Sequence, residues 1–85
     1  MPDVRVYSRP GCHLCEQLLQ ELLPLVGGSA SVEVRNVDQD PAWRQKFGAR
    51  IPVVEIDGHV VCEIRLDAQA VAAAIRRREN KAGHW

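Results

Sequence analysis

The chain has 85 residues, which is enough for one small domain. Its eleven basic and eleven acidic residues balance, so no large electrostatic field directs it to nucleic acid or to an anionic membrane. No apolar run approaches the ~20 residues needed to span a bilayer, and no apolar signal core precedes the first cysteine, so we expect a cytoplasmic protein. Three cysteines are too few for a secreted disulfide scaffold and indicate a redox or metal-binding role.

The first third of the chain predicts a strand followed by a helix. Valines alternate with other residues over Asp3–Ser8, which is the period of a half-buried strand. A helix is predicted from about His13, because leucines recur there at helical spacing. Pro24 lacks a backbone N–H and is expected to kink or end this helix, and Gly27-Gly28 is expected to close it.

The next segment, Ser31–Val37, predicts a second strand. Val32 and Val34 are expected to face the core while the charged residues beside them face water, which is typical of an edge or half-covered strand. A strand, a helix and a strand in this order imply a parallel pair joined by a right-handed crossover.

A short second helix is predicted after this strand. Asp38-Gln39-Asp40-Pro41 signals its start, because an acidic cap precedes a proline at the first helical position. The helix is predicted to run to about Phe47, with Gly48 ending it. Trp43 lies four residues before Phe47 and is expected to pack against it.

The remaining chain predicts a hairpin and a last helix. Arg50–Ile56 is a third strand, Asp57-Gly58 is the signal of a two-residue turn, and His59–Cys62 is the returning strand. The last helix begins at Leu66-Asp67, where the aspartate is a reasonable cap.

Within this last helix, Val71, Ala74 and Ile75 are expected to form the buried stripe. Arg76-Arg77-Arg78 is predicted to end the helix as a solvated cationic terminus, and residues 79–85 are predicted to be a flexible tail. The predicted order is therefore β-α-β-α-β-β-α in a single domain, residues 1–85, of the α/β class.

Two cysteines, Cys12 and Cys15, lie three residues apart where the first strand leads into the first helix. A helix N-terminus has unpaired backbone N–H groups and a partial positive charge, and both stabilise a thiolate. Cys12 is expected to be that thiolate, and Cys15, on the same helical face, can reach its sulfur. Pro10-Gly11 suits the turn into the helix, and Arg9 adds a positive charge that also favours the thiolate.

This placement predicts thiol–disulfide exchange. The Cys12 thiolate would attack a substrate disulfide, and Cys15 would then attack the mixed disulfide, release the reduced substrate and leave a Cys12–Cys15 bridge. His13, between the two cysteines, is expected to tune the stability of the thiolate.

Other roles stay open for this cysteine pair. It could hold zinc together with Cys62 or His59, although a structural zinc site usually takes four ligands and the sequence has no second CxxC. It could also be an idle dithiol in a domain that only binds other proteins. Cys62 by itself is expected to be a small buried side chain of the fourth strand.

The segment Tyr7-Ser8-Arg9-Pro10-Gly11-Cys12-His13-Leu14-Cys15 resembles the active-site segment of glutaredoxin-like proteins, and the resemblance covers roughly Val4 to Arg78. It implies a thioredoxin-like fold, with a four-stranded mixed sheet flanked by helices. It also implies a disulfide oxidoreductase with no bound cofactor, in which Cys12 is the nucleophile and Cys15 resolves the intermediate.

Ile51-Pro52 is the second family signature. In thioredoxin-fold proteins the residue pair at this place forms a cis peptide that faces the active cysteines, and the residue before the proline offers its backbone to an extended substrate. The resemblance therefore implies a cis bond and a substrate-binding role for Ile51 and Pro52, together with Arg9, Gly11 and His13.

Arg65, which we also assign to substrate binding, marks a departure from glutathione-using glutaredoxins. In those proteins the fourth strand is followed by Gly-Gly and then a Cys/Ser/Thr-Asp segment, whereas this chain has Cys62-Glu63-Ile64-Arg65, and Ile51 replaces the usual threonine or serine. These departures weaken the case for glutathione as the reductant. Arg65 is expected to be solvated, to pair with Glu63 or Asp67, or to meet a carboxylate of a partner.

The expected partners follow from this chemistry. They are a protein or small-thiol substrate that contains a disulfide, and either glutathione or a reductase that recycles the dithiol. A deglutathionylase and an electron donor to ribonucleotide reductase share the chemistry and differ in the partner.

Overall fold

The computed structural model describes the backbone of residues 2–28 and 30–83, and the side chains of these residues as far as residue 78. The helices and strands follow the predicted order, with one extra turn of 3₁₀ helix, η1. They are β1 (Asp3–Ser8), α1 (His13–Val26), β2 (Ser31–Asn36), η1 (Val37–Gln39), α2 (Pro41–Phe47), β3 (Val53–Ile56), β4 (His59–Glu63) and α3 (Ala68–Gly83). None of the helices in the described part is both long and apolar enough to cross a membrane.

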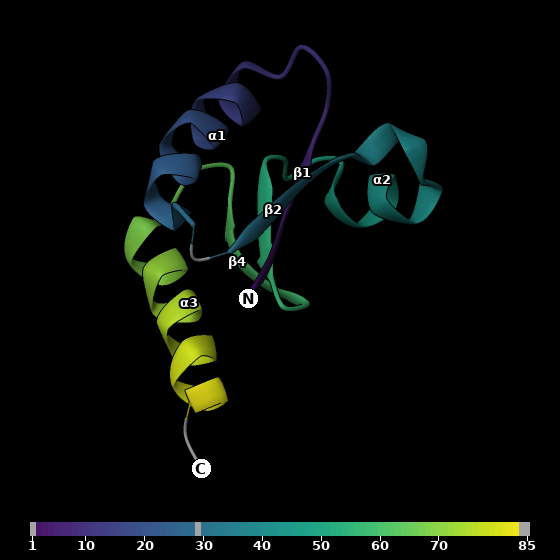
Figure 1. Ribbon diagram of the computed structural model, residues 1–85. Coiled ribbons are helices and arrows are strands. Elements are labelled where there is room, and N and C mark those ends of the chain that lie inside the picture. The colour runs from purple at the N-terminus through teal and green to yellow at the C-terminus, as the bar shows by residue number, and fades with distance from the viewer. Residues whose placement is uncertain (1, 29, 84–85) are drawn as a thin grey trace.

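The four strands form one mixed sheet in the order β2-β1-β3-β4 (Figure 1). β1 and β2 are parallel, as the helical crossover between them predicts, and the other neighbours are antiparallel. The register pairs Tyr7 with both Arg35 and Val53, and Val53 with Glu63. The ends of β1, β2 and β4 and the start of β3 therefore lie at one end of the sheet, which is also where α1 begins.

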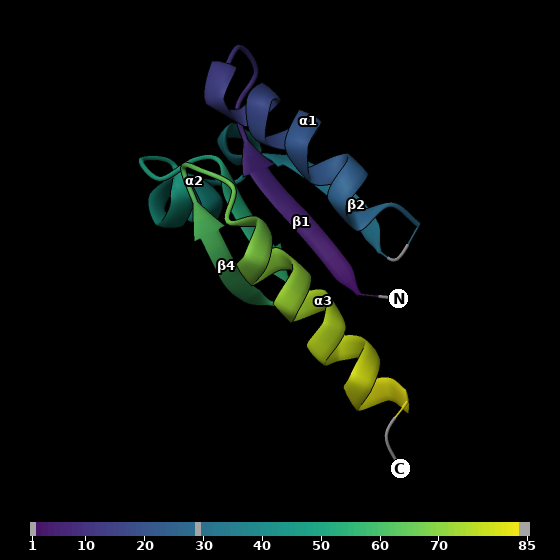
Figure 2. The ribbon, with the colours of Figure 1, turned by 90° about the vertical axis from the view of Figure 1, so that its left-hand side faces the viewer.

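Helices α1 and α3 cover one face of this sheet (Figure 2). Val4 and Val6 of β1 point to this face and are fully buried. The predicted stripe of α3 is confirmed, because Val71 and Ile75 are buried and Ala74 packs beside them. The buried residues of this core are Val4, Val6, Leu18, Leu22, Val26, Ala30, Val54, Ile56, Val71 and Ile75.

Helix α2 covers the opposite face near the end of β1 (Figure 1). The ring of Tyr7 stacks on Phe47 with the centroids 4.4 Å apart, and it meets Trp43 edge-on at 5.7 Å. Trp43 and Phe47 thus share one cluster with Tyr7 packed against both. The Tyr7 hydroxyl donates to the buried Glu55 carboxylate at 3.3 Å, which satisfies both polar groups on this face.

Pro24 does not end α1. The helix continues to Val26 and ends at Gly27, which has a φ of 52° and donates its N–H to the Leu23 carbonyl at 3.0 Å. Glycine adopts this left-handed conformation readily, so the predicted closure by glycine is confirmed. Pro24 lies within the last turn of α1, where it cannot donate the hydrogen bond that another residue would give to the Gln20 carbonyl.

Two strand predictions need correction. Val34 is 52% exposed, although we expected it in the core, because β2 is an edge strand and the buried side of α1 does not extend over this position. β3 begins at Val53 rather than Arg50, because Pro52 has no N–H to donate to a neighbouring strand.

The last helix is longer than predicted. α3 continues to Gly83 instead of ending at Arg78. The physical reason is that Glu79-Asn80-Lys81-Ala82 contains no glycine or proline and includes good helix formers. The flexibility predicted for residues 79–85 stays a prediction, and His84 and Trp85 lie outside the described residues.

Candidate active site

The cysteine pair lies at the N-terminus of α1. The Cys12 and Cys15 sulfurs are at disulfide distance, and their Cα atoms are 5.2 Å apart. Cys12 is the N-cap residue, and the backbone N–H of Cys15 donates to its sulfur at 3.2 Å. The Cys12 sulfur therefore occupies the place where a helix end stabilises negative charge, as the sequence predicts.

The two sulfurs differ in access to solvent. Cys15 is only 2% exposed and belongs to the buried side of α1, whereas Cys12 is half-buried. Cys12 is therefore the more accessible of the two cysteines to an incoming disulfide. This difference supports Cys12 as the attacking sulfur and Cys15 as the resolving one.

The loop before Cys12 is a turn that glycine makes possible. The Cys12 N–H donates to the Arg9 carbonyl at 3.1 Å, and Gly11 has a φ of 79°. With Pro10 before this glycine, the four residues match a type II turn. The predicted turn is confirmed, and Gly11 is exposed beside Cys12 with open space around it.

Arg9 is held by an acidic partner that the sequence does not suggest. Its guanidinium donates twice to the Asp38 carboxylate, at 2.9 and 3.1 Å. This hydrogen bond lowers the pKa of Asp38, and Arg44 also approaches the same carboxylate at 3.7 Å. Asp38 thus ties the loop before Cys12 to η1 and offsets much of the positive charge that Arg9 brings to the site.

The Ile51-Pro52 peptide is cis, as the resemblance implies. Pro52 directly precedes Val53, which pairs with Tyr7, so the pair lies at the same end of the sheet as the dithiol. Ile51 is half-buried in the cluster around Tyr7, and Pro52 is fully buried. His13, the remaining residue of the predicted site, is exposed on the first turn of α1.

Arg65 forms neither of the ion pairs that we considered for it. Glu63 pairs instead with Arg50, and Asp67 caps α3 by accepting the Ala70 N–H at 3.0 Å. Within the part of the chain that the structure describes, Arg65 is exposed and takes part in no ion pair.

The third cysteine, Cys62, is half-buried in β4 and packs against the core under α3. Burial raises the pKa of its thiol. His59, named as a possible zinc partner of the dithiol, pairs with Ile56 at the opposite end of the sheet. Among the described residues, no three histidine, cysteine or acidic side chains gather closely enough to hold a metal ion.

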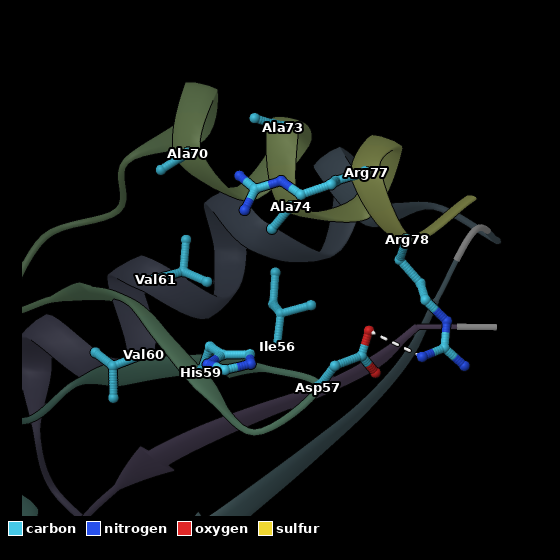
Figure 3. A pocket seen from close by; sticks show the side chains of 10 residues that line it. All are labelled: Ile56, Asp57, His59, Val60, Val61, Ala70, Ala73, Ala74, Arg77 and Arg78. Carbon is cyan, nitrogen blue, oxygen red and sulfur yellow. Dashed lines mark ion pairs between the residues drawn. The ribbon is translucent and has the colours of Figure 1, made fainter. Parts of the chain in front are cut away.

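Hollows of different size lie at the dithiol and at the opposite end of the sheet. An open hollow of about 370 Å³ borders the dithiol on the side of β2, and Gly11, Cys12 and Cys15 form part of its wall. A larger hollow of about 540 Å³ lies between α3 and the β3–β4 hairpin, where Arg77 extends across alanines of α3 (Figure 3). This second hollow has no cysteine in its lining and lies away from the dithiol.

Sequence reasoning missed two features of this site, namely Asp38 as the partner of Arg9 and the backbone conformation of Ile64. Ile64 has a φ of 68°, which is rare for a β-branched residue. The Arg9–Asp38 pair had no signal in the sequence, because it depends on the parallel register, which places Ser8 beside Asn36 and so brings the two following segments together. No sequence signal predicts the conformation of Ile64, because isoleucine normally indicates extended backbone.

Comparison with known proteins gives one family and one fold. The family model described as Glutaredoxin-like domain (DUF836) matches residues 3–76. An uncharacterized protein of Mycobacterium tuberculosis is 29% identical over 89% of this chain and 84% of its own length. The solution structure of a protein from Nitrosomonas europaea is 31% identical, covers 85% of this chain and 88% of its own, and superposes with a TM-score of 0.76.

The fold extends to more distant proteins. Thioredoxin 1 from Thermosipho africanus is 17% identical, covers 95% of this chain and 98% of its own, and superposes with a TM-score of 0.67. The chain therefore has the thioredoxin-like fold that the resemblance predicts, an α/β fold with a CxxC pair at disulfide distance.

Proposed function

The chain belongs to the family of glutaredoxin-like domains, and from this premise we propose that it is a thiol–disulfide oxidoreductase. One observation carries the proposal. The half-buried sulfur of Cys12 caps α1 and lies at bonding distance from the buried sulfur of Cys15. A reactive sulfur and a protected partner are what a two-step exchange requires.

The proposed cycle begins with both cysteines reduced. The Cys12 thiolate attacks one sulfur of a substrate disulfide, so that the substrate S–S bond breaks, a mixed disulfide forms and the first substrate thiolate leaves. Cys15 then loses its proton and attacks the Cys12 sulfur, which forms the Cys12–Cys15 bond and releases the second substrate thiolate. The substrate gains the two electrons that the dithiol loses, and an external thiol donor must return them.

The surroundings of Cys12 favour the first step. The N–H of Cys15 donates to the sulfur, and the other N–H groups of the first helical turn have no partner within the helix. Arg9 contributes less than its charge suggests, because Asp38 pairs with it. The helix end is therefore the main source of thiolate stabilisation in this proposal.

The nature of the external donor is part of the proposal. Glutathione is the reductant of typical glutaredoxins, yet this chain has Ile51 before the proline and Ile64-Arg65 after β4 in place of the polar and glycine residues. We propose that a reductase that acts on thioredoxin-like proteins serves this chain better than glutathione does. The substrate is a disulfide of another protein.

A recycling assay tests this proposal. Reduction of insulin disulfides is followed with electrons supplied either by thioredoxin reductase or by glutathione and glutathione reductase. We expect turnover that depends on Cys12, so that Cys12→Ser lowers the rate by at least roughly a hundredfold, as loss of a nucleophile commonly does. Cys62→Ser serves as the matched control and should keep the wild-type rate.

The comparison of the two electron donors tests whether thioredoxin reductase or glutathione recycles the dithiol. Turnover with thioredoxin reductase and little with glutathione is the expected result. Efficient turnover with glutathione would show that Ile51, Ile64 and Arg65 do not prevent its use. No turnover with either donor, or wild-type turnover by Cys12→Ser, would contradict an oxidoreductase centred on this dithiol.

A further inference from the structure

The hollow of about 540 Å³ between α3 and the β3–β4 hairpin lies at the end of the sheet away from the dithiol (Figure 3). Its size is within the range of sites that hold small molecules, roughly 300–1,000 Å³. The described residues that line it include no cysteine and no residue of the connection between β4 and α3. The hollow is therefore separate from the site of the proposed exchange reaction.

An irregularity in β4 brings an additional apolar side chain to this hollow. The pairing with β3 skips Val61, since Val60 and Cys62 pair with consecutive residues of that strand. An extra residue in one strand of an antiparallel pair is a β-bulge. Neighbouring residues of a regular strand point to opposite faces, yet Val60 and Val61 both line the hollow. Bulges re-aim side chains in this way and are frequent beside functional sites.

The rest of the wall is also largely apolar. The buried side chain of Ile56 lies between the hairpin and α3, and the α3 side is formed by Ala70, Ala73 and Ala74 (Figure 3). The alanines reach only as far as one methyl group, which leaves room beside them. Val60 is 42% exposed, so apolar surface in the hollow is in contact with water. An apolar group that covers Val60 would remove this surface from water, which favours its binding.

Two nitrogen-bearing side chains, Arg77 and His59, border the hollow from α3 and from the hairpin (Figure 3). Arg77 extends back along α3, as long helical side chains do, so its guanidinium lies across the alanines of the wall. It is exposed and takes part in no ion pair among the described residues. Asp57, the acidic residue of the described lining, is already paired with Arg78 at 3.6 Å. The charge of Arg77 is therefore available to a ligand.

We propose that this hollow binds an organic carboxylate with a compact apolar body, of the size of a branched-chain acid. The planar guanidinium of Arg77 matches a carboxylate and would bind it through two parallel N–H donors, while the body covers Val60 and Val61. His59 supplies a further N–H donor on the opposite side. The nearby carboxylate of Asp57 disfavours an anion of higher charge. This inference does not depend on the dithiol and goes beyond the proposed function.

Matched probes separate the contribution of charge from that of the apolar body. They are isocaproate, its neutral amide, the corresponding amine isohexylamine, and acetate, which lacks the body. Each is titrated into isotope-labelled protein near neutral pH and at low salt, and the backbone amide signals are followed by NMR. We expect isocaproate to shift the signals of β4 and of the segment Ala70–Arg78. Its affinity should exceed that of acetate about tenfold, because of the apolar body, and that of the amide about threefold, because of one exposed ion pair.

A further probe identifies the source of the carboxylate. The peptide Ac-Gly-Gly-Leu has the same branched body beside a free C-terminal carboxylate. Tighter binding of this peptide than of isocaproate would support the proposal with a peptide C-terminus as the ligand, and weaker binding would support it with a free acid.

Substitutions locate the binding within the hollow. Arg77→Ala should lower the affinity for isocaproate about threefold and remove its advantage over the amide. Arg76→Ala is the matched control, because Arg76 is the neighbouring exposed arginine of α3 and does not line the hollow. Ala73→Leu keeps a good helix former and fills the hollow, so it should weaken binding at least about tenfold with an unchanged circular dichroism spectrum. Cys12→Ser should bind isocaproate as the wild type does.

Three results would overturn the proposal. They are equal affinity of the wild type for isocaproate and for its amide or amine, signal shifts confined to segments outside the hairpin and α3, and equal losses of affinity in Arg77→Ala and Arg76→Ala. The proposed function is tested separately, because insulin reduction depends on Cys12 and isocaproate binding does not. A protein that binds isocaproate but reduces no disulfide would overturn the proposed function and leave this inference intact.

Discussion

Cys12 and Cys62 show how position decides the chemistry of a thiol. The Cys12 sulfur is half-buried at the start of α1 and accepts the N–H of Cys15. Burial raises the pKa of the Cys62 thiol and outweighs the hydrogen bond that the thiol makes with the Asp67 backbone at the start of α3. At neutral pH the reduced protein should therefore hold thiolate at Cys12 and neutral thiol at Cys62.

Alkylation of the reduced protein tests this difference. With limiting iodoacetamide at neutral pH, Cys12 should be modified more than about tenfold faster than Cys62, because both thiolate fraction and access favour it. Peptide mapping by mass spectrometry measures the two rates in one sample, and Cys12→Ser gives the rate of Cys62 without competition. Equal or faster modification of Cys62 would contradict the assignment.

Individual residues show where the local sequence predicts the backbone conformation and where it does not. Pro10-Gly11 predicts a turn, and Gly11 does adopt a φ of 79° there. Asp57-Gly58 predicts a two-residue hairpin turn, and both residues have a positive φ. Ile64 has an equally positive φ that no residue preference indicates, because its conformation is imposed by the bond to Pro52 and by the start of α3.

Among the elements, η1 holds the loop that carries the nucleophile. Asp38 of η1 accepts two hydrogen bonds from Arg9, and the Asn36 side chain accepts the Asp38 N–H at 2.9 Å. The bond to Arg9 lowers the pKa of Asp38 below that in the unfolded chain. The ion pair therefore stabilises the fold fully at pH values above the pKa of Asp38 in the unfolded chain, roughly 4. This stabilisation is lost as the pH falls through the lower pKa of Asp38 in the folded chain.

The variant Asp38→Asn tests how much the Arg9–Asp38 ion pair contributes to the stability of the fold. Near neutral pH the variant should unfold at a midpoint a few degrees lower at most, because exposed ion pairs stabilise weakly, and the difference should shrink as the pH falls below about 4. Thermal unfolding followed by circular dichroism from pH 7 downward measures it. Glu21→Gln, at an exposed position of α1 without an ion pair among the described residues, is the matched control. A difference in unfolding midpoint that grows as the pH falls would contradict a lowered pKa of Asp38 in the folded protein.

The boundaries of elements were predicted well where a local signal ended them. Gly27 ends α1 and Asp67 caps α3, and both signals are readable from the sequence. The end of α3 was predicted wrongly because three arginines suit a helix terminus without terminating it, and the backbone stays helical to Gly83. The exposure of Val34 was missed because alternation shows which side a residue faces, not whether a helix covers that side.

At the scale of the whole molecule, one sheet separates two cores and brings the site together at one end. β1 is buried on both faces, with Val4 and Val6 under α1 and α3 and Tyr7 under α2. The fold class and the dithiol were predictable, because they depend on element order and on a local motif. The pairing of Arg9 with Asp38 and the turn at Ile64 were not, because they depend on register between segments distant in the chain.

In the proposed cycle, Cys12 attacks the substrate disulfide and Cys15 resolves the intermediate. The most direct measurement is the mass of the reduced Cys15→Ser protein after exposure to a peptide disulfide, followed by mapping of the modified residue. We expect a stable mixed disulfide on Cys12 with one peptide, and no such adduct in the Cys12→Ser, Cys15→Ser double variant. An adduct on Cys62, or no adduct at all, would contradict it.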